Sequence, residues 1–273
     1  MKYLNIKSAL TIMLSLLTAI VAQAQQIPMY TGYTVNNFLL SPSFAGTDDA
    51  DARLMALNRL QFAGIEGAPV TYMLTGDAPI RKKNMGLGAT LYTDKYGLLR
   101  QTGIGLGYSY NIQMGDDTKV YFGLGAELGQ LSLDFDNIVA KDMTDELLNQ
   151  GSANKLVVNG NFGIHLKHKD FTIGFAAPQI FGTRVTYQNY VSNQETNYQL
   201  ERHYMALMSY KFSVNDNLDL EPIVLMRTVS GLSPQFDINM MATIKNNVFV
   251  NHYIELITRS YFDSGLDIHI FTN

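Results

Sequence analysis

The sequence predicts an all-β protein, specifically a transmembrane antiparallel up-and-down β-barrel of about twelve strands with both termini in the periplasm. Three observations support this prediction. After residue 50, apolar residues recur at every second position in segment after segment, as they do in strands with one apolar and one polar face. The connections between these segments alternate between short and long, and outer-membrane barrels have short periplasmic turns and longer external loops. The chain also begins like an export signal.

The alternation is clearest in four segments, residues 101–112, 119–129, 156–167 and 235–245. In the first, one face is largely apolar or aromatic and the other carries glycine and small polar residues. The apolar face comprises Thr102, Ile104, Leu106, Tyr108, Tyr110 and Ile112. Because successive side chains of a strand point to opposite faces, each segment has one apolar and one wet surface. We expect the first strand at residues 52–61 and the last at residues 265–272.

The expected connections fall into two classes that interleave along the chain. The short ones are rich in Gly, Asn, Asp and Lys, as tight turns require, and cover residues 79–84, 113–118, 168–170, 215–217 and 245–247. The long ones cover residues 62–69, 93–100, 135–154, 179–198, 227–234 and 259–264. This rhythm predicts that all the long loops lie at one end of the barrel. An even number of strands then places both termini at the other, periplasmic end.

The sequence predicts that the chain has three parts. Lys2 and Lys7 precede an apolar run that ends in Ala22-Gln23-Ala24, so residues 1–24 are predicted to be a signal peptide cleaved near Ala24. A retained N-terminal membrane anchor is the alternative, which the polar residues within the run disfavour. Residues 25–50 form a periplasmic or plug-like segment, and residues 51–273 form the barrel. Whether the strands after about Val248 close the barrel is left open, because that stretch alternates poorly.

Composition excludes several classes of function. Charged residues make up 16% of the chain, below the roughly 25% of ordinary soluble domains. The 16 Tyr and 14 Phe suit the aromatic girdles found at both membrane interfaces. With no cysteine, disulfides and thiol chemistry are excluded. Without the signal peptide, 18 basic and 24 acidic residues remain, a net charge of 18 − 24 = −6, and nothing suggests nucleic acid as a partner.

No residue pattern predicts an enzyme, a metal site or a cofactor. The five histidines, His165, His168, His203, His252 and His269, lack zinc-site spacing. Asp48, Asp49 and Asp51 could bind calcium, but they lack the ordered pattern of a calcium loop, and a solvated turn explains them better. The nucleophile motif G-x-S-x-G is absent.

Seven glycines are predicted to form a bare patch on the inward faces of three successive strands. They are Gly86, Gly88, Gly103, Gly105, Gly107, Gly123 and Gly125. Glycine within a strand is tolerated where a barrel bends sharply or where another backbone approaches closely. Curvature is therefore one interpretation. The other is that residues 25–50, or a long loop, fold into the lumen against this lumen glycine patch as a plug, which replacement of Gly105 by a bulky residue would test.

Four stretches of the N-terminal third carry a family resemblance. They are residues 26–33 (QIPMYTGY), 41–46 (SPSFAG), 59–71 (RLQFAGIEGAPVT), and 84–88 (NMGLG) with Asp94 and Gly97. These stretches resemble the PorP/SprF family of type IX secretion membrane proteins. The first two are similar to its patterns Q-x-P-x-Y-x-x-Y and N-P-A-Y-A-G, the third is similar to R-x-Q-W-x-G-I-E-G-A-P-x-T, and the fourth fits two further elements. Ser41, Ser43 and Phe62 depart from the family pattern.

This resemblance implies a non-enzymatic outer-membrane component of the type IX secretion and gliding apparatus. Such a protein supports secretion or surface anchoring of adhesin-type cargo and contacts outer-membrane lipid and periplasmic secretion components. The loop that the strand count places outside is the candidate partner or cargo contact, and it comprises Gly64, Ile65, Glu66, Gly67, Ala68 and Pro69. A tight structural loop is the alternative for these residues. For the whole chain the alternatives are a porin or hydrophobic-solute transporter with an N-terminal plug and, third, an outer-membrane enzyme.

Overall fold

In a computed structural model of the chain, the structure describes residues 31–47, 52–62, 64–65, 67–80, 83–133, 153–189, 194–229, 234–244, 248–257 and 261–270. The main element is a 13-stranded antiparallel sheet. Its neighbouring strands follow the order β1-β2-β3-β4-β5-β6-β7-β10-β12-β13-β14-β15. The thirteenth strand, β11, follows β10 in the chain and also pairs with β12. Counting β10 and β11 as one position beside β12 gives twelve strands across the sheet, as predicted. The strands are β1 (Arg53–Leu60), β2 (Val70–Ile80), β3 (Met85–Tyr96), β4 (Leu99–Gln113), β5 (Thr118–Leu133), β6 (Ala153–His168), β7 (Phe171–Ala177), β10 (His203–Tyr210), β11 (Phe212–Asn215), β12 (Leu218–Val229), β13 (Gln235–Ile244), β14 (Val248–Ile257) and β15 (Tyr261–Ile270).

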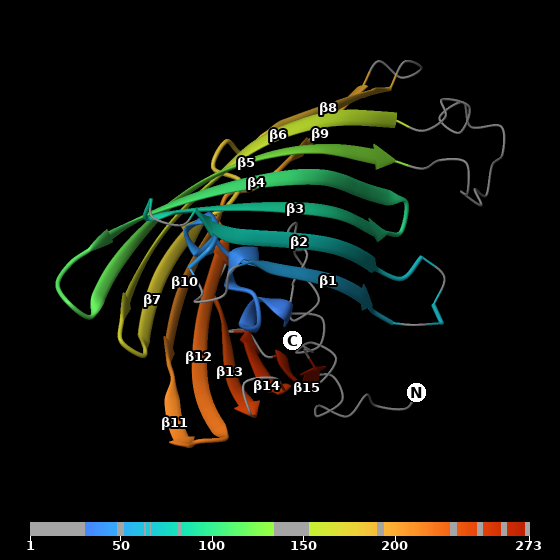
Figure 1. Cartoon of the computed structure of the whole chain (residues 1–273). Helices are drawn as coiled ribbons and strands as arrows, with labels where there is room; N and C mark the ends of the chain where they lie inside the picture. Colours follow the sequence, from blue (N-terminus) through green and yellow to red (C-terminus); the bar gives the residue numbers. More distant parts are fainter. Residues whose placement is uncertain are drawn as a thin grey trace, which may run out of the picture.

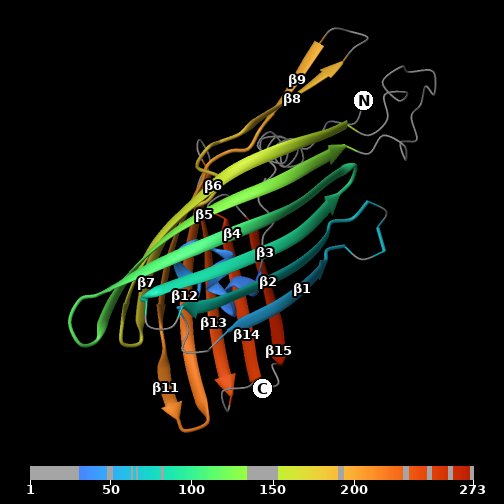
Figure 2. The ribbon, with the colours of Figure 1, turned by 45° about the horizontal axis from the view of Figure 1, so that its top comes forward.

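The sheet curls around the N-terminal segment, as barrels do (Figure 1). β1 to β6 lie on one side of three short 3-10 helices, and β12 to β15 lie on the other, an arrangement that the second view also shows (Figure 2). The two edge strands are β1, which pairs with β2, and β15, which pairs with β14. Among the described strands, no pairing joins β1 to β15. With twelve strands on the path, β1 begins and β15 ends at the end of the sheet that carries the short turns.

The two faces of the sheet are inverted relative to a water-soluble protein. Large apolar side chains point outward, and Leu54, Leu106 and Leu124 are 75%, 60% and 62% exposed. Polar side chains such as Ser109 and Asn159 are buried on the inner face. This inversion is what a barrel surrounded by lipid requires. No helix in the described residues is long and apolar enough to cross a membrane.

The prediction of a long connection at residues 93–100 is wrong. β3 and β4 are joined by a tight turn of Gly97 and Leu98, in which Gly97 adopts a positive φ of 58°. Lys95 and Arg100 pair across the two strands. Their charges made the strand ends look like a loop, whereas strand ends beyond the lipid can face water on both sides.

Residues 179–198 are not simply a long loop either. They contain most of a separate two-stranded hairpin of β8 (Arg184–Asn189) and β9 (Gln194–Gln199), inserted between β7 and β10. The last strand also lies slightly earlier than predicted, at residues 261–270. The predicted turn at 245–247 and the signal peptide lie outside the described residues.

Three 3-10 helices, η1 (Thr31–Thr34), η2 (Asn37–Leu39) and η3 (Pro42–Phe44), lie within the curl of the sheet (Figure 1). Local sequence explains where the last two begin. The Asn36 side chain accepts a hydrogen bond from the Phe38 backbone at 3.1 Å, and the Ser41 hydroxyl accepts one from the Ser43 backbone at 3.2 Å. Both are N-cap contacts, and Pro42 begins η3, where its missing N–H costs nothing. We refer to residues 31–47 as the inner segment.

Candidate functional site

The inner segment forms one hydrophobic core with the wall of β7, β10, β12 and β13. Its buried members are Tyr33, Phe38, Phe44 and Ala45. Opposite them lie the buried apolar residues Ala176, Met205, Leu207, Ile223, Leu225 and Met241. Here the inner face of the sheet is apolar because it contacts protein and not water. One hydrophobic core of the described structure therefore lies between the segment and the sheet, and a second, of Leu131, Val157, Val185 and Leu200, lies near the long-loop end.

The opposite wall is smooth where the backbone of the inner segment touches it. A β-carbon added to Gly86 would overlap the carbonyl of Ala45, and one added to Gly123 would overlap the backbone of Ser43. At Gly163 the contact is with a side chain, because the Ser41 hydroxyl occupies the space of an added β-carbon. Only glycine allows a contact this close between two backbones.

Phe38 fills the next row of this wall. A β-carbon on Gly107 would lie 2.6 Å from its Cε2 atom, and one on Gly88 would overlap the same ring. Gly88 and Gly107 are direct partners in the register of β3 and β4. The ring of Phe38 thus lies against two glycines of the predicted patch.

The remaining three glycines of the patch do not touch the inner segment. Gly103 makes room for the ring of Tyr92, whose hydroxyl would lie 2.7 Å from an added β-carbon. Gly105 faces open space, with Thr90 at 3.8 Å, and Gly125 faces Asn161. The seven glycines therefore have two kinds of surroundings, and Gly105 lies on the side that the segment does not reach.

Polar contacts add specificity at residues 41–46. The His165 ring stacks on Phe44 with centroids 3.9 Å apart, and its Nδ1 atom hydrogen-bonds the Ser43 hydroxyl at 3.0 Å. On its other side the ring stacks on Tyr121 at 4.3 Å. Ser109 donates its hydroxyl proton to the Ala45 carbonyl at 2.6 Å. Buried polar groups with partners fix one arrangement of a segment, since any other leaves them unpaired.

Asp77 anchors the end of the inner segment. Its carboxylate accepts a hydrogen bond from the Gly46 backbone at 2.8 Å and forms an ion pair with Arg53 at 3.0 Å. Gly46 itself has a positive φ of 61° and is packed against the backbone of Ala78. The turn that leads out of the segment is therefore fastened to β1 and β2 together.

Tyr33 anchors the beginning of the segment to the opposite wall. Its hydroxyl accepts a hydrogen bond from the Asn239 amide at 2.6 Å and donates one to Asp237 at 3.4 Å. Arg227 bonds the same carboxylate at 2.8 Å. Burial, together with the Asp237 carboxylate, raises the pKa of the Tyr33 phenol above its ordinary value. The phenol therefore stays protonated in the folded protein.

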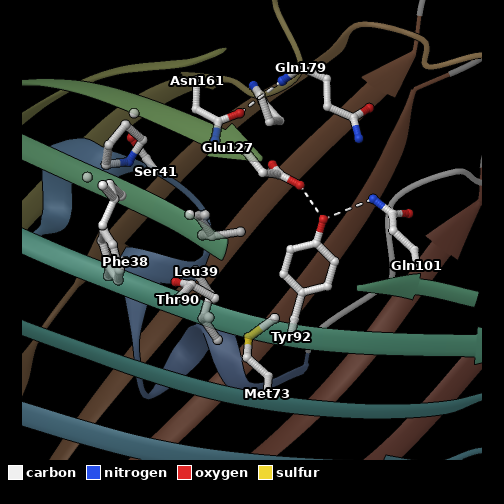
Figure 3. A pocket seen from close by; sticks show the side chains of 17 residues that line it. Phe38, Leu39, Ser41, Met73, Thr90, Tyr92, Gln101, Glu127, Asn161 and Gln179 are labelled. Carbon is white, nitrogen blue, oxygen red and sulfur yellow. Dashed lines mark hydrogen bonds between the residues drawn. The ribbon is translucent and has the colours of Figure 1, made fainter. Parts of the chain in front are cut away.

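Two cavities flank the inner segment. The loop-end cavity, of about 140 Å³, lies between residues 38–42 and strands β2 to β6, towards the long-loop end (Figure 3). The turn-end cavity, of about 400 Å³, is lined by Gly46, Thr47 and residues close to the short turns, Lys119 and Lys167 among them. The segment thus lies between a partly apolar cavity on one side and a polar one on the other.

The predicted contact loop is exposed at the long-loop end of the sheet. Ile65 is 66% exposed, and the neighbouring Phe62, with a positive φ of 56°, is 64% exposed. Gly64 and Gly67 also have positive φ values, of 96° and 76°. The Gly97 backbone donates a hydrogen bond to the Gly67 carbonyl at 2.9 Å, and the Gln61 backbone donates one to the Pro69 carbonyl at 3.0 Å. Ala68 is partly buried, and Glu66 lies outside the described residues. The described part of the loop is shaped by its glycines and exposes the apolar side chains of Phe62 and Ile65.

Sequence reasoning missed several residues of this site. Gly163 and His165 lie on the inner face of β6, which the alternation had identified, but nothing local shows that Ser41 and Phe44 meet them. No motif of the sequence analysis includes Asp77. No group of three or more His, Cys, Asp or Glu residues that could hold a metal occurs in the described chain. Asp48, Asp49 and Asp51, the calcium alternative, lie outside it.

The fold and the site define a protein of the outer-membrane β-barrel class, with its N-terminal segment inside the curl of the sheet. The family model described as "Type IX secretion system membrane protein PorP/SprF" matches residues 22–256. The chain therefore belongs to this family, and the resemblance identified from its motifs is confirmed. No curated protein matches the sequence.

Three solved structures illustrate the similarity of the fold. The KdgM porin is 8% identical with a TM-score of 0.40, and the match covers 81% of this chain and 98% of the porin. The translocator domain of the autotransporter NalP from Neisseria meningitidis is 12% identical with a TM-score of 0.43, covering 81% and 88%. The CymD monoaromatic hydrocarbon channel is 10% identical with a TM-score of 0.39, covering 76% and 74%. At these identities the likeness concerns the fold alone.

Proposed function

We propose that the chain is a non-enzymatic outer-membrane component of the type IX secretion and gliding apparatus, and that its inner segment is a resident plug. In this role it supports secretion or surface anchoring of adhesin-type protein cargo. Its partners are outer-membrane lipid, periplasmic secretion components and the cargo. The observation that carries the proposal is the close packing of residues 41–46 against the inner face of strands β2 to β6. These residues form one of the motifs that resemble the family pattern.

A plug held in this way favours a scaffold over an open channel. The segment is fastened at both ends, by Tyr33 on one wall and Asp77 on the other, and it shares a hydrophobic core with the sheet. Filling the lumen with packed side chains leaves little room for a continuous column of water. The barrel then offers a rigid membrane anchor whose loops are available for partners.

The loop of residues 64–69 is the proposed contact for partner or cargo. Exposed apolar side chains at a loop tip are common in protein interaction sites, and Ile65 and Phe62 provide two of them. The backbone bond from Gly97 to Gly67 holds this loop against the neighbouring turn. Replacing Ile65 by Ser should lower cargo retention at the surface while leaving the amount of assembled protein unchanged.

The second candidate function is a porin or hydrophobic-solute transporter with an N-terminal plug. The loop-end cavity favours it, since Leu39, Leu40 and Met73 supply an apolar lining. This function needs the plug to move, whereas the scaffold does not.

Deletion of the gene in its own host, combined with reconstitution, tests the two. The proposal expects loss of adhesin-type cargo from the cell surface, restored by the wild-type gene, and no conductance above background in planar bilayers. Normal cargo display in the deletion strain would refute the secretion role. Stable conductance with normal cargo display would favour the porin.

A further inference from the structure

We propose that the loop-end cavity is a binding site for a primary alkylammonium group. The proposal does not depend on the secretion role, because it concerns the chemistry of the cavity itself. Its lining combines one acid, a glutamine whose buried amide oxygen lacks a hydrogen-bond partner, and an apolar wall. The hydrogen bonds and ion pair that hold the inner segment do not involve Glu127 or Gln179.

Gln179 carries the first part of the argument. Its side chain lines the cavity and is 6% exposed, and its Oε1 atom is buried without a hydrogen-bond partner. Its backbone has a positive φ of 56°, which is uncommon outside glycine and costs free energy. The Asn161 amide oxygen holds it there by accepting from its backbone at 3.0 Å. A strained residue that lines a cavity and whose buried amide oxygen lacks a partner points to a ligand site, where a small side-chain rotation would let the oxygen bond a donor.

Glu127 supplies the charge. It accepts a hydrogen bond from the Tyr92 hydroxyl, which in turn accepts one from the Gln101 amide at 3.0 Å (Figure 3). Among the described residues that line the cavity, Glu127 is the single acid and there is no lysine or arginine. A carboxylate in a partly buried cavity without a cationic neighbour attracts a cation more strongly than one in water does.

The apolar lining and the volume then set the class of ligand. Leu39, Leu40 and Met73 form a wall that an ammonium ion alone would not use. About 140 Å³ is close to the roughly 150 Å³ that accommodates a benzene ring. The cavity therefore suits an alkyl chain of about four carbons that ends in an ammonium group, with N–H donors for Gln179 Oε1 and for Glu127. A small free amine and the side chain of a lysine in a polypeptide share this chemistry.

The test measures binding of n-butylammonium to the full chain purified in detergent, by saturation-transfer NMR titration with empty micelles as the blank. We expect saturable binding in about the millimolar range, as the small number of ligand atoms requires. We also expect little binding of 1-butanol or butyrate, which have the same chain without the positive charge. Equal binding of 1-butanol would overturn the role of Glu127, and no saturable binding of butylammonium, with water alone filling the cavity, would overturn the site.

Variants and a second probe complete the test. Glu127→Gln should weaken butylammonium binding at least about tenfold, because a charge-assisted contact is lost. Asp116→Asn makes the same change of charge at the turn-end cavity and should leave binding unaltered; equal losses in both variants would refute the proposal. Nα-acetyl-lysine methylamide separates the two sources of the ligand. If it competes with butylammonium, a polypeptide lysine fits the site, and if it does not, the site takes a free amine.

Discussion

Phe44 and His165 lie face to face, with ring centroids 3.9 Å apart and planes 8° apart, although one belongs to the inner segment and the other to β6. Tyr121 stacks on the far side of the same imidazole. The histidine is therefore the middle of three stacked rings and also bonds Ser43. The His165 side chain thus contacts the inner segment both by ring stacking and by a hydrogen bond.

Replacing His165 by Ala should remove both kinds of contact. We expect the free energy of unfolding to fall by about 3 kcal/mol, as for other large buried rings, measured from the temperature at which heat-modifiable gel mobility is lost. The control is His168→Ala, an exposed residue whose ring bonds Thr118 at the surface, where changes are usually within about 0.5 kcal/mol. If the two variants behaved alike, the stacked rings would not hold the segment.

The lumen glycine patch gives a second prediction, which compares Gly123→Ala with Gly105→Ala. The added methyl group would overlap the backbone of Ser43 in the first variant, but it would meet only Thr90, at 3.8 Å, in the second. Because the chain has no cysteine, Ala45→Cys can report exposure of the segment by its rate of maleimide labelling. We expect Gly123→Ala to raise this rate at least about tenfold, since overpacking costs about 1–3 kcal/mol. Similar labelling rates in both variants would argue against close packing of the inner segment on Gly123.

The strands could be predicted from sequence because lipid and lumen impose different requirements on alternate residues. Leu106 and Leu124 are outward while Gly105 and Gly125 are inward, in agreement with the alternation. The prediction failed at residues 93–100, where Asp94, Lys95 and Arg100 continue a strand although their composition is that of a loop. Periodicity identifies a strand only where its two faces meet different surroundings.

The candidate site was less accessible, because periodicity gives the face of a residue but not its distant partner. Gly107 and Gly105 have the same pattern in sequence, yet one contacts Phe38 and the other contacts nothing of the segment. Asp77 and His165 have no local signal for their contacts with the inner segment, since Gly46 and Ser43 are distant in sequence. Such contacts depend on the path of the inner segment, which no local rule specifies.

The ion pair at the end of the segment leads to a third prediction. Asp77→Ala would remove the carboxylate that pairs with the Arg53 guanidinium and that accepts the hydrogen bond of the Gly46 N–H. Because the Asp77 carboxylate is buried while the Arg53 side chain is 20% exposed, we expect a cost of about 1–3 kcal/mol and a clear fall in the unfolding temperature. Asp117→Ala, which breaks an exposed pair with Lys169, should cost less than about 1 kcal/mol. A cost below that of the exposed pair would show that Asp77 does not anchor the segment.

The phenol of Tyr33 predicts a dependence on alkaline pH. Burial and Asp237 raise its pKa in the folded state, whereas in the unfolded chain it titrates near about 10. The unfolded state then binds fewer protons above that pH, so this contribution to stability is complete below pH about 10 and is lost as the pH rises further. In Tyr33→Phe the decline of the unfolding temperature between about pH 9 and 11 should be shallower. An unchanged slope in that variant would show that the phenol is not held protonated.

The inverted surface gives the last prediction, because two apolar side chains of equal exposure have different surroundings. Leu106 in the middle of β4 and Met114 in the turn after it are both 60% exposed. In a soluble protein Lys would be tolerated equally at either site. If the outward face of β4 contacts lipid, Leu106→Lys should cost about 2–4 kcal/mol and reduce the heat-modifiable species in the outer-membrane fraction. Met114→Lys lies beyond the lipid and should assemble normally. Equal assembly of the two variants would mean that this face does not meet the hydrocarbon of the membrane.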